Sequence, residues 1–334
     1  MATGATPRAT ATRVEATAVA RTNIALVKYW GKRAGDGNLP AAGSLSLTLD
    51  GLFTRTTVAF DSTLSVDDVW LGSAPADTDT TARVVAFLDL VRTRAGTTHR
   101  ARVTSMNSFP TGSGLASSAS AFAALALAAT RAAALTLSAR DLSALARRGS
   151  GSAARSIFGG LVEMSSDGDD PHATPLLDAS AWDLRMVVAV VGGGRPKEVL
   201  SRAGMAHTAA TSPLHRAWLD TVPADLAAAK DAITRRDLAA LGEVAERSAL
   251  GMHATALAAR PGLLYFRGAT VDALHAVRAL RAGGANAWVT IDAGPHVKVL
   301  CAPTDEARVA AVLGGVPDVT EVHRCRPGAG AELE

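Results

Sequence analysis

Residues Asn107 to Thr130 read NSFPTGSGLASSASAFAALALAAT, a polar, glycine-bearing loop that passes directly into a run of small apolar residues. The run predicts a helix. Three residues that precede the run, Pro110, Gly112 and Gly114, let backbone N–H groups turn inward. Ser117 and Ser118 place hydroxyls at the expected helix start, where unpaired amides and the helix dipole favour an anion. The stretch predicts a cradle for a polyphosphate with bound Mg²⁺. A glycine-rich turn before an ordinary core helix fits the same composition.

The composition is that of an ordinary globular protein, and 334 residues predict roughly two domains. Hydrophobic residues make up 48% of the chain and aromatic residues 4%, so helices are expected to pack closely through small side chains. The net charge of +3 comes without a basic stripe or stacking aromatics, which argues against a nucleic-acid partner. No uninterrupted apolar run is long enough for a transmembrane helix, so no membrane partner is expected.

Two cysteines, Cys301 and Cys325, form neither a disulfide framework nor a metal-ligand pattern, which predicts a reducing compartment and by default the cytoplasm. Residues 1–14 lack the apolar segment of a secretory signal and are expected to form a disordered lead, with an organelle transit peptide as the alternative. The histidines lack zinc-site spacing, and no G-x-x-x-x-G-K-[ST] occurs. The sequence therefore predicts neither a protein-ligated zinc site nor a P-loop.

The order of expected strands and helices predicts α+β layers in two halves. An N-terminal domain is expected over residues 15–180 and a C-terminal domain over 181–326, with a loose tail at 327–334. Within the first domain we expect a strand split near Arg21 and a hairpin that turns at Asp50-Gly51. In the second domain the sequence predicts that one helix ends and another begins at Pro223.

Residues 28–32 read KYWGK and place two of the five lysines in one short segment after an apolar strand. A lysine this near a strand interior usually has a carboxylate or phosphate partner, because an unpaired buried ammonium group is costly. Lys28 is therefore a candidate anion-binding or ion-paired residue. If the strand continues, alternation sends Lys28, Trp30 and Lys32 to one face and Tyr29 to the other. A core position for Trp30 and a solvated one for Lys32 are the alternatives.

Residues 147–156, RRGSGSAARS, alternate small hydroxyl residues and glycines between guanidinium groups. Arginine recognises carboxylate or phosphate through a planar fork, and Ser150 and Ser152 can complete an oxyanion shell. A plain linker between helices is the alternative. Two anion-binding loops in one chain predict a substrate that carries its own phosphate or carboxylate besides a nucleotide.

Asp292 ends an apolar strand within TIDAGP, residues 290–295. A turn aspartate that bonds its own backbone is the commoner reason for this pattern when the segment is read alone. As a general base, Asp292 would need a nearby cation to keep it ionised, and Lys28 is the candidate. Arg202, on a helix that follows three glycines, is either a solvated residue or a further phosphate contact.

Five separated segments in this order make the chain resemble the GHMP-kinase superfamily and, within it, the diphosphomevalonate decarboxylases. They are residues 23–33, 107–120, 147–156, 201–205 and 292–300, which read NIALVKYWGKR, NSFPTGSGLASSAS, RRGSGSAARS, SRAGM and DAGPHVKVL. The resemblance implies a two-domain GHMP-kinase fold in which each half is a mainly antiparallel sheet with helices packed on one side. It also implies a homodimer that uses ATP and Mg²⁺ to decarboxylate 5-diphosphomevalonate to isopentenyl diphosphate.

The resemblance implies three catalytic residues: Asp292 as the base facing the tertiary 3-hydroxyl, Lys28 beside it, and Arg155 on the substrate carboxylate. The implied substrate-binding residues are Tyr29, Lys32, Ser150, Ser152, Arg155, Ser201, Arg202 and Met205. The implied ATP-binding residues are Asn107, Pro110, Gly112, Ser113, Gly114, Leu115, Ala116, Ser117 and Ser118. The last two would also lie nearest to Mg²⁺. Kinase-only relatives lack the aspartate of the last segment, so Asp292 favours a decarboxylase over a mevalonate kinase.

The chain departs from the pattern of the family at a few positions. Ala41-Ala42-Gly43 stand where polar residues are usual, Ser108 and His296 each replace a common asparagine, and Ala154 replaces a common cysteine. The loss of polar groups beside the substrate leaves mevalonate 5-phosphate or another 3-hydroxy acid as alternative substrates. A non-catalytic nucleotide-binding regulator is the more distant alternative, against which the three catalytic candidates argue.

Overall fold

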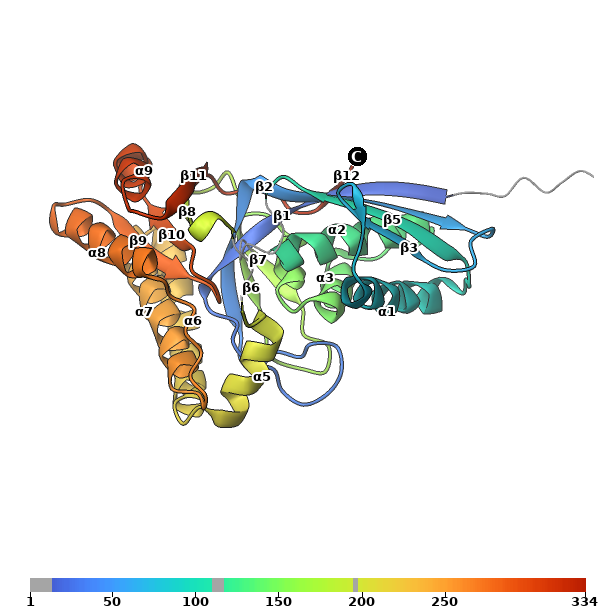
Figure 1. Cartoon of the computed structure of the whole chain (residues 1–334), viewed down its shortest axis with the longest axis horizontal. Helices are drawn as coiled ribbons and strands as arrows, with labels where there is room; N and C mark the ends of the chain where they lie inside the picture. The colour runs from blue at the N-terminus through green and yellow to red at the C-terminus, as the bar shows by residue number, and fades with distance from the viewer. Residues whose placement is uncertain (1–13, 110–116, 195–197) are drawn as a thin grey trace, which may run out of the picture.

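The computed structural model describes residues 14–109, 117–194 and 198–334. Figure 1 shows two halves side by side, the N-terminal half in blue and green and the C-terminal half in yellow to red. Each half is built on its own sheet, and the predicted α+β class is confirmed. In the described part of the chain, no helix is long and apolar enough to cross a membrane.

The N-terminal half is built on an eight-stranded sheet. Its strands are β1 Val14–Val27, β2 Ser44–Asp61, β3 Asp68–Leu71, β4 Ala74–Pro75, β5 Arg100–Asn107, β6 Leu161–Met164, β7 Ala173–Leu177 and β12 Glu332–Leu333. The main order is β12-β1-β2-β5-β3-β4, and β6 and β7 extend from β2. Among these described strands, β3 and β5 form the only parallel pair, and all other neighbouring strands are antiparallel. The helices of this half are α1 Thr78–Ala95, α2 Ser117–Ala132, α3 Ala139–Gly149 and α4 Ala153–Ser156.

β2 is one long strand, so the hairpin predicted at Asp50 and Gly51 is wrong. β1 is likewise continuous where a split near Arg21 is expected. The two strands pair antiparallel along their length, with a register shift between Arg21 and Asn23. Since β2 has more residues than β1 at this place, the extra residues bulge, and Gly51 takes a φ of +85°. The turn-forming residues therefore bend the strand without ending it.

Small side chains let α2 lie close beneath β1 and β2. Most of its residues are buried, and the buried set is largely alanine. On the neighbouring α3, Gly149 has no room for a side chain, because a Cβ there would lie 2.1 Å from Phe122 Cδ1. The predicted close packing through small residues is confirmed in this layer.

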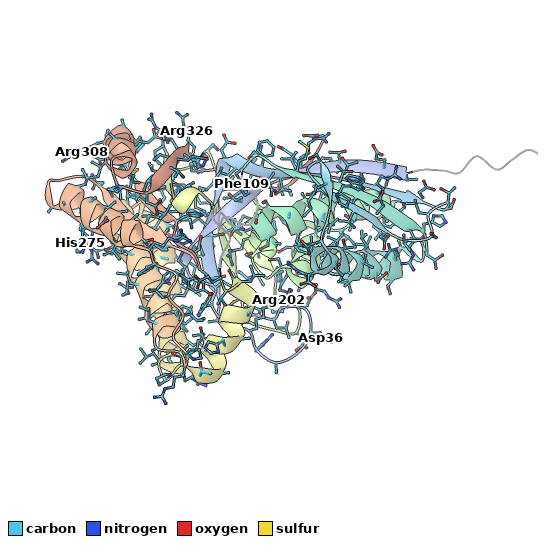
Figure 2. All side chains as sticks on the ribbon, in the orientation of Figure 1. Asp36, Phe109, Arg202, His275, Arg308 and Arg326 are labelled. Atoms are coloured by element: carbon cyan, nitrogen blue, oxygen red, sulfur yellow. The ribbon has the colours of Figure 1, made fainter. Side chains whose placement is uncertain are left out.

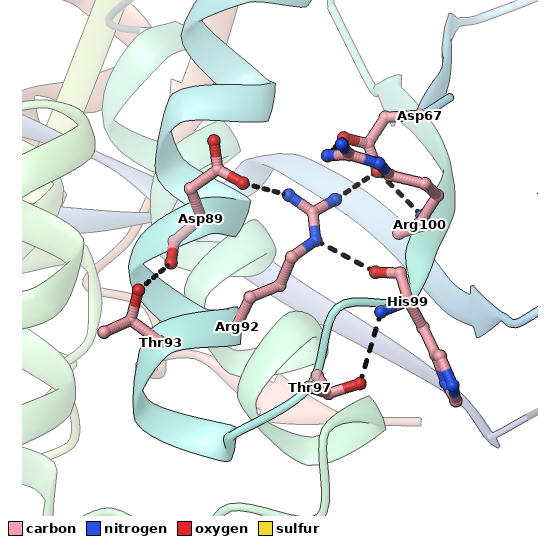
Figure 3. Close-up of polar contacts among 8 residues, drawn as sticks. Asp67, Asp89, Arg92, Thr93, Thr97, His99 and Arg100 are labelled. Carbon is pink, nitrogen blue, oxygen red and sulfur yellow. Dashed lines mark hydrogen bonds and ion pairs between the residues drawn. The ribbon is translucent and has the colours of Figure 1, made fainter. Parts of the chain in front are cut away.

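Figure 3 shows a buried arginine that fixes α1 against the sheet. Arg92 is 5% exposed, and its guanidinium donates to the carboxylates of Asp67 and Asp89. It also donates to the carbonyl of His99 at 2.9 Å, while the Asp67 carboxylate accepts from Ala101 N–H at 2.7 Å. A buried guanidinium is tolerated only with such partners. The network sets the position of α1, which forms one wall of a pocket described below.

The C-terminal half is built on a four-stranded antiparallel sheet. Its strands are β8 Arg185–Val191, β9 Ala287–Ile291, β10 Val297–Cys301 and β11 Val319–Cys325, in the order β11-β8-β10-β9. Its helices are α5 Ser201–Thr211, α6 His215–Arg235, α7 Leu238–Leu257, α8 Gly268–Ala282 and α9 Glu306–Gly314. Every residue of β8 is buried, as expected for a strand covered on both faces. α8 and α9 cover one face, and α7 adds a layer on the other.

α6 continues through Pro223, so the predicted break between two helices is wrong. Proline supplies no N–H to the helix, yet Trp218 and Val222 of the same segment are buried in the core. Packing of the apolar face therefore outweighs the lost hydrogen bond.

Residues 327–334, predicted to be a loose tail, are held against the larger sheet at both ends, by the strand β12 and by a bridge between Pro327 and Leu49, so this prediction is wrong. β12 pairs with β1, and Gly328 N–H donates to the Thr48 carbonyl at 2.8 Å. Arg21 forms an ion pair with Glu332 at 2.8 Å. Most of these contacts use the backbone, which every sequence carries, so composition could not reveal them. The domain boundaries at residues 180 and 326 stay a prediction.

Removal of residues 327–334 should lower the free energy of unfolding by roughly 1–3 kcal/mol, because β1 loses a neighbouring strand. Urea denaturation of the full and shortened chains measures the difference. The matched control is the double variant Glu332→Ala/Glu334→Ala, which removes only half-exposed ion pairs and should cost less than about 1 kcal/mol. An unchanged midpoint for the shortened chain would contradict the structural role of the tail.

Candidate active site

The ends of β1 and β9 meet at the junction between the two halves. Thr290 Oγ1 on β9 donates to the Ala25 carbonyl on β1 at 3.2 Å. The surrounding core includes residues of β1, β2, β8 and α7, so it belongs to both halves. Lys28 directly follows β1 and Asp292 directly follows β9. The junction therefore brings these two predicted residues together.

Asp292 lies between two buried lysines. Lys28 Nζ donates to Asp292 Oδ1 at 2.7 Å and to the Ala25 carbonyl at 2.7 Å. Lys298 Nζ, from β10, lies 3.2 Å from Asp292 Oδ2. The lysine side chains are 2% and 0% exposed, whereas the Asp292 side chain is 23% exposed. The carboxylate is thus the member of the cluster that a substrate can reach.

The charges in this cluster shift one another's pKa. Burial lowers the pKa of Lys28 to about 8; the Asp292 charge opposes this shift, and the Lys298 and Arg155 charges add to it. Burial by itself would raise the pKa of Asp292, but the two ammonium groups outweigh it and hold that pKa below its ordinary value. At neutral pH, Asp292 is a carboxylate and Lys28 is mostly an ammonium ion.

Arg155, on α4, is 1% exposed and has only neutral partners among its hydrogen bonds. Its Nε donates to Ser46 Oγ at 2.9 Å and to Asn23 Oδ1 at 3.3 Å, and its Nη1 donates to Ser44 Oγ. Within the described ranges it forms no ion pair with a carboxylate. Burial lowers the pKa of Arg155 to about 10, so the group stays charged. A buried guanidinium without a counter-ion favours binding of an anion.

A second group of cations lies beside the first. Lys32 Nζ donates to Asn38 Oδ1 at 2.6 Å, and burial together with the charges of Arg202 and Arg83 lowers the pKa of Lys32 to about 8. Burial raises the pKa of Tyr29 to about 12, so this side chain is a neutral phenol. Figure 2 labels Arg202 near the start of α5. Over the part of the chain that is described, neither Lys32 nor Arg202 is ion-paired with a carboxylate, so the group suits a polyanion.

Three serines connect the start of α2 to the loop that follows α3. Ser150 Oγ lies 3.3 Å from Ser118 Oγ and 3.3 Å from Ser152 Oγ. Between them, Gly151 leaves space for Tyr29, whose hydroxyl oxygen would lie 2.3 Å from a Cβ at that position. The two loops that the sequence singles out for anion binding are therefore neighbours.

A pocket of about 540 Å³ lies between α1, β3, β5 and the start of α2. Apolar residues such as Val69, Val103 and Phe122 line part of it, and Asn107, Ser117 and Ser118 are also in its wall. The guanidinium of Arg83 lies 5.1 Å from the centre of the Phe122 ring. The volume and the mixture of apolar and polar side chains in the wall are typical of a small-molecule site.

The remaining predicted residues fall into two groups. Ser201 is the first residue of α5, and Met205 is 7% exposed in the core beside the junction. The other group, Pro110, Gly112, Ser113, Gly114, Leu115 and Ala116, lies outside the described residues.

Sequence reasoning missed Lys298, Asn23, Ser44, Ser46 and Arg83. Lys298 could have been found, because it lies in VKVLC, a buried strand in which a lysine needs a partner for the same reason as Lys28. The two serines and the asparagine carry no such local signal. They become recognisable only once Arg155 is placed against them.

The described residues contain no group of three or more histidine, cysteine, aspartate or glutamate side chains that could hold a metal ion. Mg²⁺ binds through few protein ligands and often through substrate phosphates. The hydroxyls of Ser117 and Ser118 therefore fit a magnesium ion that is held mainly by a bound nucleotide.

The two sheets and this junction define an enzyme of the GHMP-kinase fold, whose solved members superpose on nearly the whole chain. Residues 20–174 match the family model of the diphosphomevalonate decarboxylase-like N-terminal domain. Residues 186–326 match the model of the mevalonate 5-diphosphate decarboxylase C-terminal domain. The chain belongs to the diphosphomevalonate decarboxylase family, which confirms the resemblance.

Relatives of known identity match over most of their length. The mevalonate diphosphate decarboxylase structure from Staphylococcus aureus is 38% identical, with a TM-score of 0.92 over 97% of this chain and 98% of that one. The chain in a structure titled MDDEF in complex with MVAPP, AMPPCP and magnesium is 41% identical. It superposes with a TM-score of 0.91 over 97% of this chain and 99% of that chain. The human diphosphomevalonate decarboxylase is 35% identical over 90% of this chain and 80% of its own.

Proposed function

We propose that the chain converts (R)-5-diphosphomevalonate and ATP into isopentenyl diphosphate, ADP, phosphate and CO₂. One observation carries the proposal. A reachable carboxylate, Asp292, lies against Lys28, while the buried guanidinium of Arg155 nearby has no carboxylate ion-paired with it in the described part of the chain. These groups match the substrate, which presents a tertiary hydroxyl next to a carboxylate.

Asp292 is placed to accept a hydrogen bond from the 3-hydroxyl and finally its proton. Because its pKa is held low, it is a weak base, so its main contribution is to orient the oxygen and to balance the lysine charges. This suits phosphoryl transfer, where positioning of the nucleophile matters more than early proton removal. The 3-oxygen bonds to the γ-phosphorus of ATP while the bond from that phosphorus to the bridging oxygen breaks, ADP leaves with that oxygen and its electron pair, and the hydroxyl proton passes to Asp292.

Arg155 holds the substrate carboxylate during the second stage. The C3–O bond breaks, phosphate leaves with the electron pair, and positive character develops at C3. The electrons of the bond to the carboxylate then form the C=C double bond, and CO₂ leaves. Serine and asparagine oxygens fix the guanidinium plane, so the carboxylate is oriented by a rigid donor.

The phosphate groups are assigned to the remaining polar residues. Tyr29, Lys32, Ser150, Ser152, Ser201 and Arg202 surround the substrate diphosphate, and Met205 lines the pocket. Ser117 and Ser118 hold the ATP phosphates with Mg²⁺, which supplies charge neutralisation on the transferred phosphoryl group. The apolar part of the 540 Å³ pocket accepts the adenine ring.

The test is a comparison of substrates with ATP and Mg²⁺, in which ADP and CO₂ are both measured. With 5-diphosphomevalonate we expect one CO₂ for each ADP, and with mevalonate 5-phosphate a much slower reaction. ADP without CO₂ would indicate a kinase. No turnover with any mevalonate derivative would refute the proposal and favour a nucleotide-binding regulator.

The Ala41-Ala42-Gly43 segment has a packing reason that is compatible with the diphosphate substrate. A Cβ on Gly43 would lie 2.7 Å from Leu226 Cδ1 and 3.1 Å from the Met164 carbonyl. Close packing therefore accounts for the glycine. Where the structure describes the chain, the side chains of Lys32 and Arg202 form no hydrogen bond with these three residues, and Lys32 is held by Asn38 instead.

The value of kcat/KM for the phosphorylated mevalonate should fall above pH 8. The pKa of Lys28 and that of Lys32 are both about 8 in the free protein, and each amine is cationic only below its pKa. The decline should approach about tenfold per pH unit for each amine that must be charged. Lys32→Arg should shift its part of the decline to higher pH, since arginine stays protonated. A flat profile up to pH 10 would contradict these roles.

We also propose that the chain forms a homodimer, on the basis of the family resemblance. A cytoplasmic location is proposed on the basis of the cysteine content. Sedimentation equilibrium tests the dimer, and a monomer at micromolar concentration would refute it.

A further inference from the structure

Lys298 occupies a place where a lysine is costly. It is the second residue of β10, a strand in which every residue is buried, and its side chain is 0% exposed. Its partners across the sheet are Val188 on β8 and Thr290 on β9, neither of which carries a charge. Among the described residues, its ammonium group has no hydrogen-bond partner. An apolar residue would fill the strand without this desolvation cost, so packing alone does not account for the lysine.

The counter-charge that offsets this cost is Asp292. Lys298 Nζ lies 3.2 Å from Asp292 Oδ2, in an ion pair that lacks hydrogen-bond geometry. Oδ2 is buried, although the Asp292 side chain as a whole is 23% exposed. Oδ1 is therefore the oxygen that a substrate can approach, and it also accepts a hydrogen bond from Lys28 Nζ at 2.7 Å. Two separate cations, one beside each oxygen, fix the rotation of the carboxylate.

The titratable groups whose charges act on Asp292 come from several elements: Lys28 after β1, Lys298 on β10, Arg155 on α4 and His253 on α7. Burial lowers the pKa of His253 to about 3, so this ring is neutral. Burial alone would raise the pKa of Asp292, and the charges of Lys28 and Lys298 hold it low. Burial also lowers the pKa of Lys28, and the Lys298 charge adds to this shift. Removal of the Lys298 charge should therefore raise the pKa of both Asp292 and Lys28.

We infer that Lys298 is a positioning residue that holds Asp292 Oδ2 from the protein interior and thereby turns Oδ1 toward Lys28 and the substrate 3-hydroxyl. It does not contact the substrate, because its side chain is fully buried. It acts on the reaction only through Asp292, so its loss should lower turnover and leave substrate binding intact. The inference rests on the proposed decarboxylase function.

The first experiment compares Lys298→Met with the unmodified full chain in the ADP and CO₂ assay. Methionine is similar in length but carries no ammonium group. We expect kcat to fall about 10- to 100-fold, the scale of a small misplacement of a reacting group, with both KM values nearly unchanged. The acid side of the pH profile of kcat/KM should also move to higher pH, since Asp292 keeps one adjacent lysine instead of two. The control is Leu300→Met, at a buried position on the same face of β10, which changes packing but no charge and should keep the kcat and the profile of the unmodified chain.

A second experiment tests whether Lys298 acts through Asp292. In a chain that already carries Asp292→Asn, Lys298→Met should lower the single-turnover release of CO₂ by less than about twofold, because the carboxylate that Lys298 holds is gone. A residue that only supports the fold would lower the rate by the same factor in both backgrounds.

The outcomes separate this inference from the function on which it rests. An unmodified chain without turnover would refute the proposed function, and the inference with it. An active unmodified chain, together with an acid side of the profile that Lys298→Met leaves in place, would overturn the inference alone. Equal losses from Lys298→Met in the two backgrounds would do the same. If circular dichroism shows that the Met variant does not fold, Lys298→Gln, which also removes the charge, takes its place and is judged by the same two results.

Discussion

Asp292→Asn should lower turnover about 10³-fold or more while the substrate still binds. The carboxylate lies 2.7 Å from Lys28 Nζ and 3.2 Å from Lys298 Nζ. Asparagine keeps the shape of the side chain but removes the negative charge and the proton acceptor. The cations assigned to the substrate diphosphate are not altered. Single-turnover release of CO₂ measures the rate, and titration calorimetry measures binding.

The same variant has a signature in protein stability. The pKa of Asp292 in the folded protein lies below its ordinary value. The charged carboxylate therefore stabilises the fold at any pH above the ordinary pKa, and this stabilisation is lost as the pH falls from there toward the folded-state pKa. The melting temperature of the unmodified chain should therefore fall more between pH 7 and pH 3 than that of the variant. Turnover within about tenfold of normal would remove Asp292 from the mechanism. Loss of substrate binding would instead indicate a disrupted site.

The meeting of Lys28 and Asp292 could be predicted because each residue is unusual in its own segment. A lysine at the end of an apolar strand needs a partner, and an aspartate at the end of another needs a cation. Local reasoning could not show that these two strands, far apart in sequence, end at the same place. The family resemblance supplied that step, and the 2.7 Å ion pair confirms the contact.

The wrong predictions share a physical cause. At Asp50-Gly51 and at Pro223, local residues favour a turn or a break, and long-range packing overrides them. At residues 327–334, position at the end of the chain suggests a loose tail, but backbone pairing with β1 holds it. In each case the deciding partner is remote in sequence, and a local pattern holds no information about it.

Arg155→Lys should lower kcat/KM for the substrate by about 10²-fold or more, with both kcat and KM affected. The guanidinium is held by Ser44, Ser46 and Asn23, each from a strand of the larger sheet. A lysine presents one point charge on a shorter donor and leaves some of these buried oxygens without a partner. The substrate carboxylate then loses both its planar donor and its fixed orientation. Steady-state kinetics with varied 5-diphosphomevalonate measure both constants.

The matched control for Arg155 is Arg148→Lys, an exposed arginine in the same RRGSGSAARS segment, which should leave both constants unchanged. If Arg155→Lys also leaves them unchanged, the carboxylate binds elsewhere. A rise in KM alone would show that Arg155 holds the ground state but does not help the reaction. A fall in kcat is required by the proposal, because the carboxylate must keep its orientation while phosphate leaves, so that the electrons of the breaking C–C bond can form the double bond.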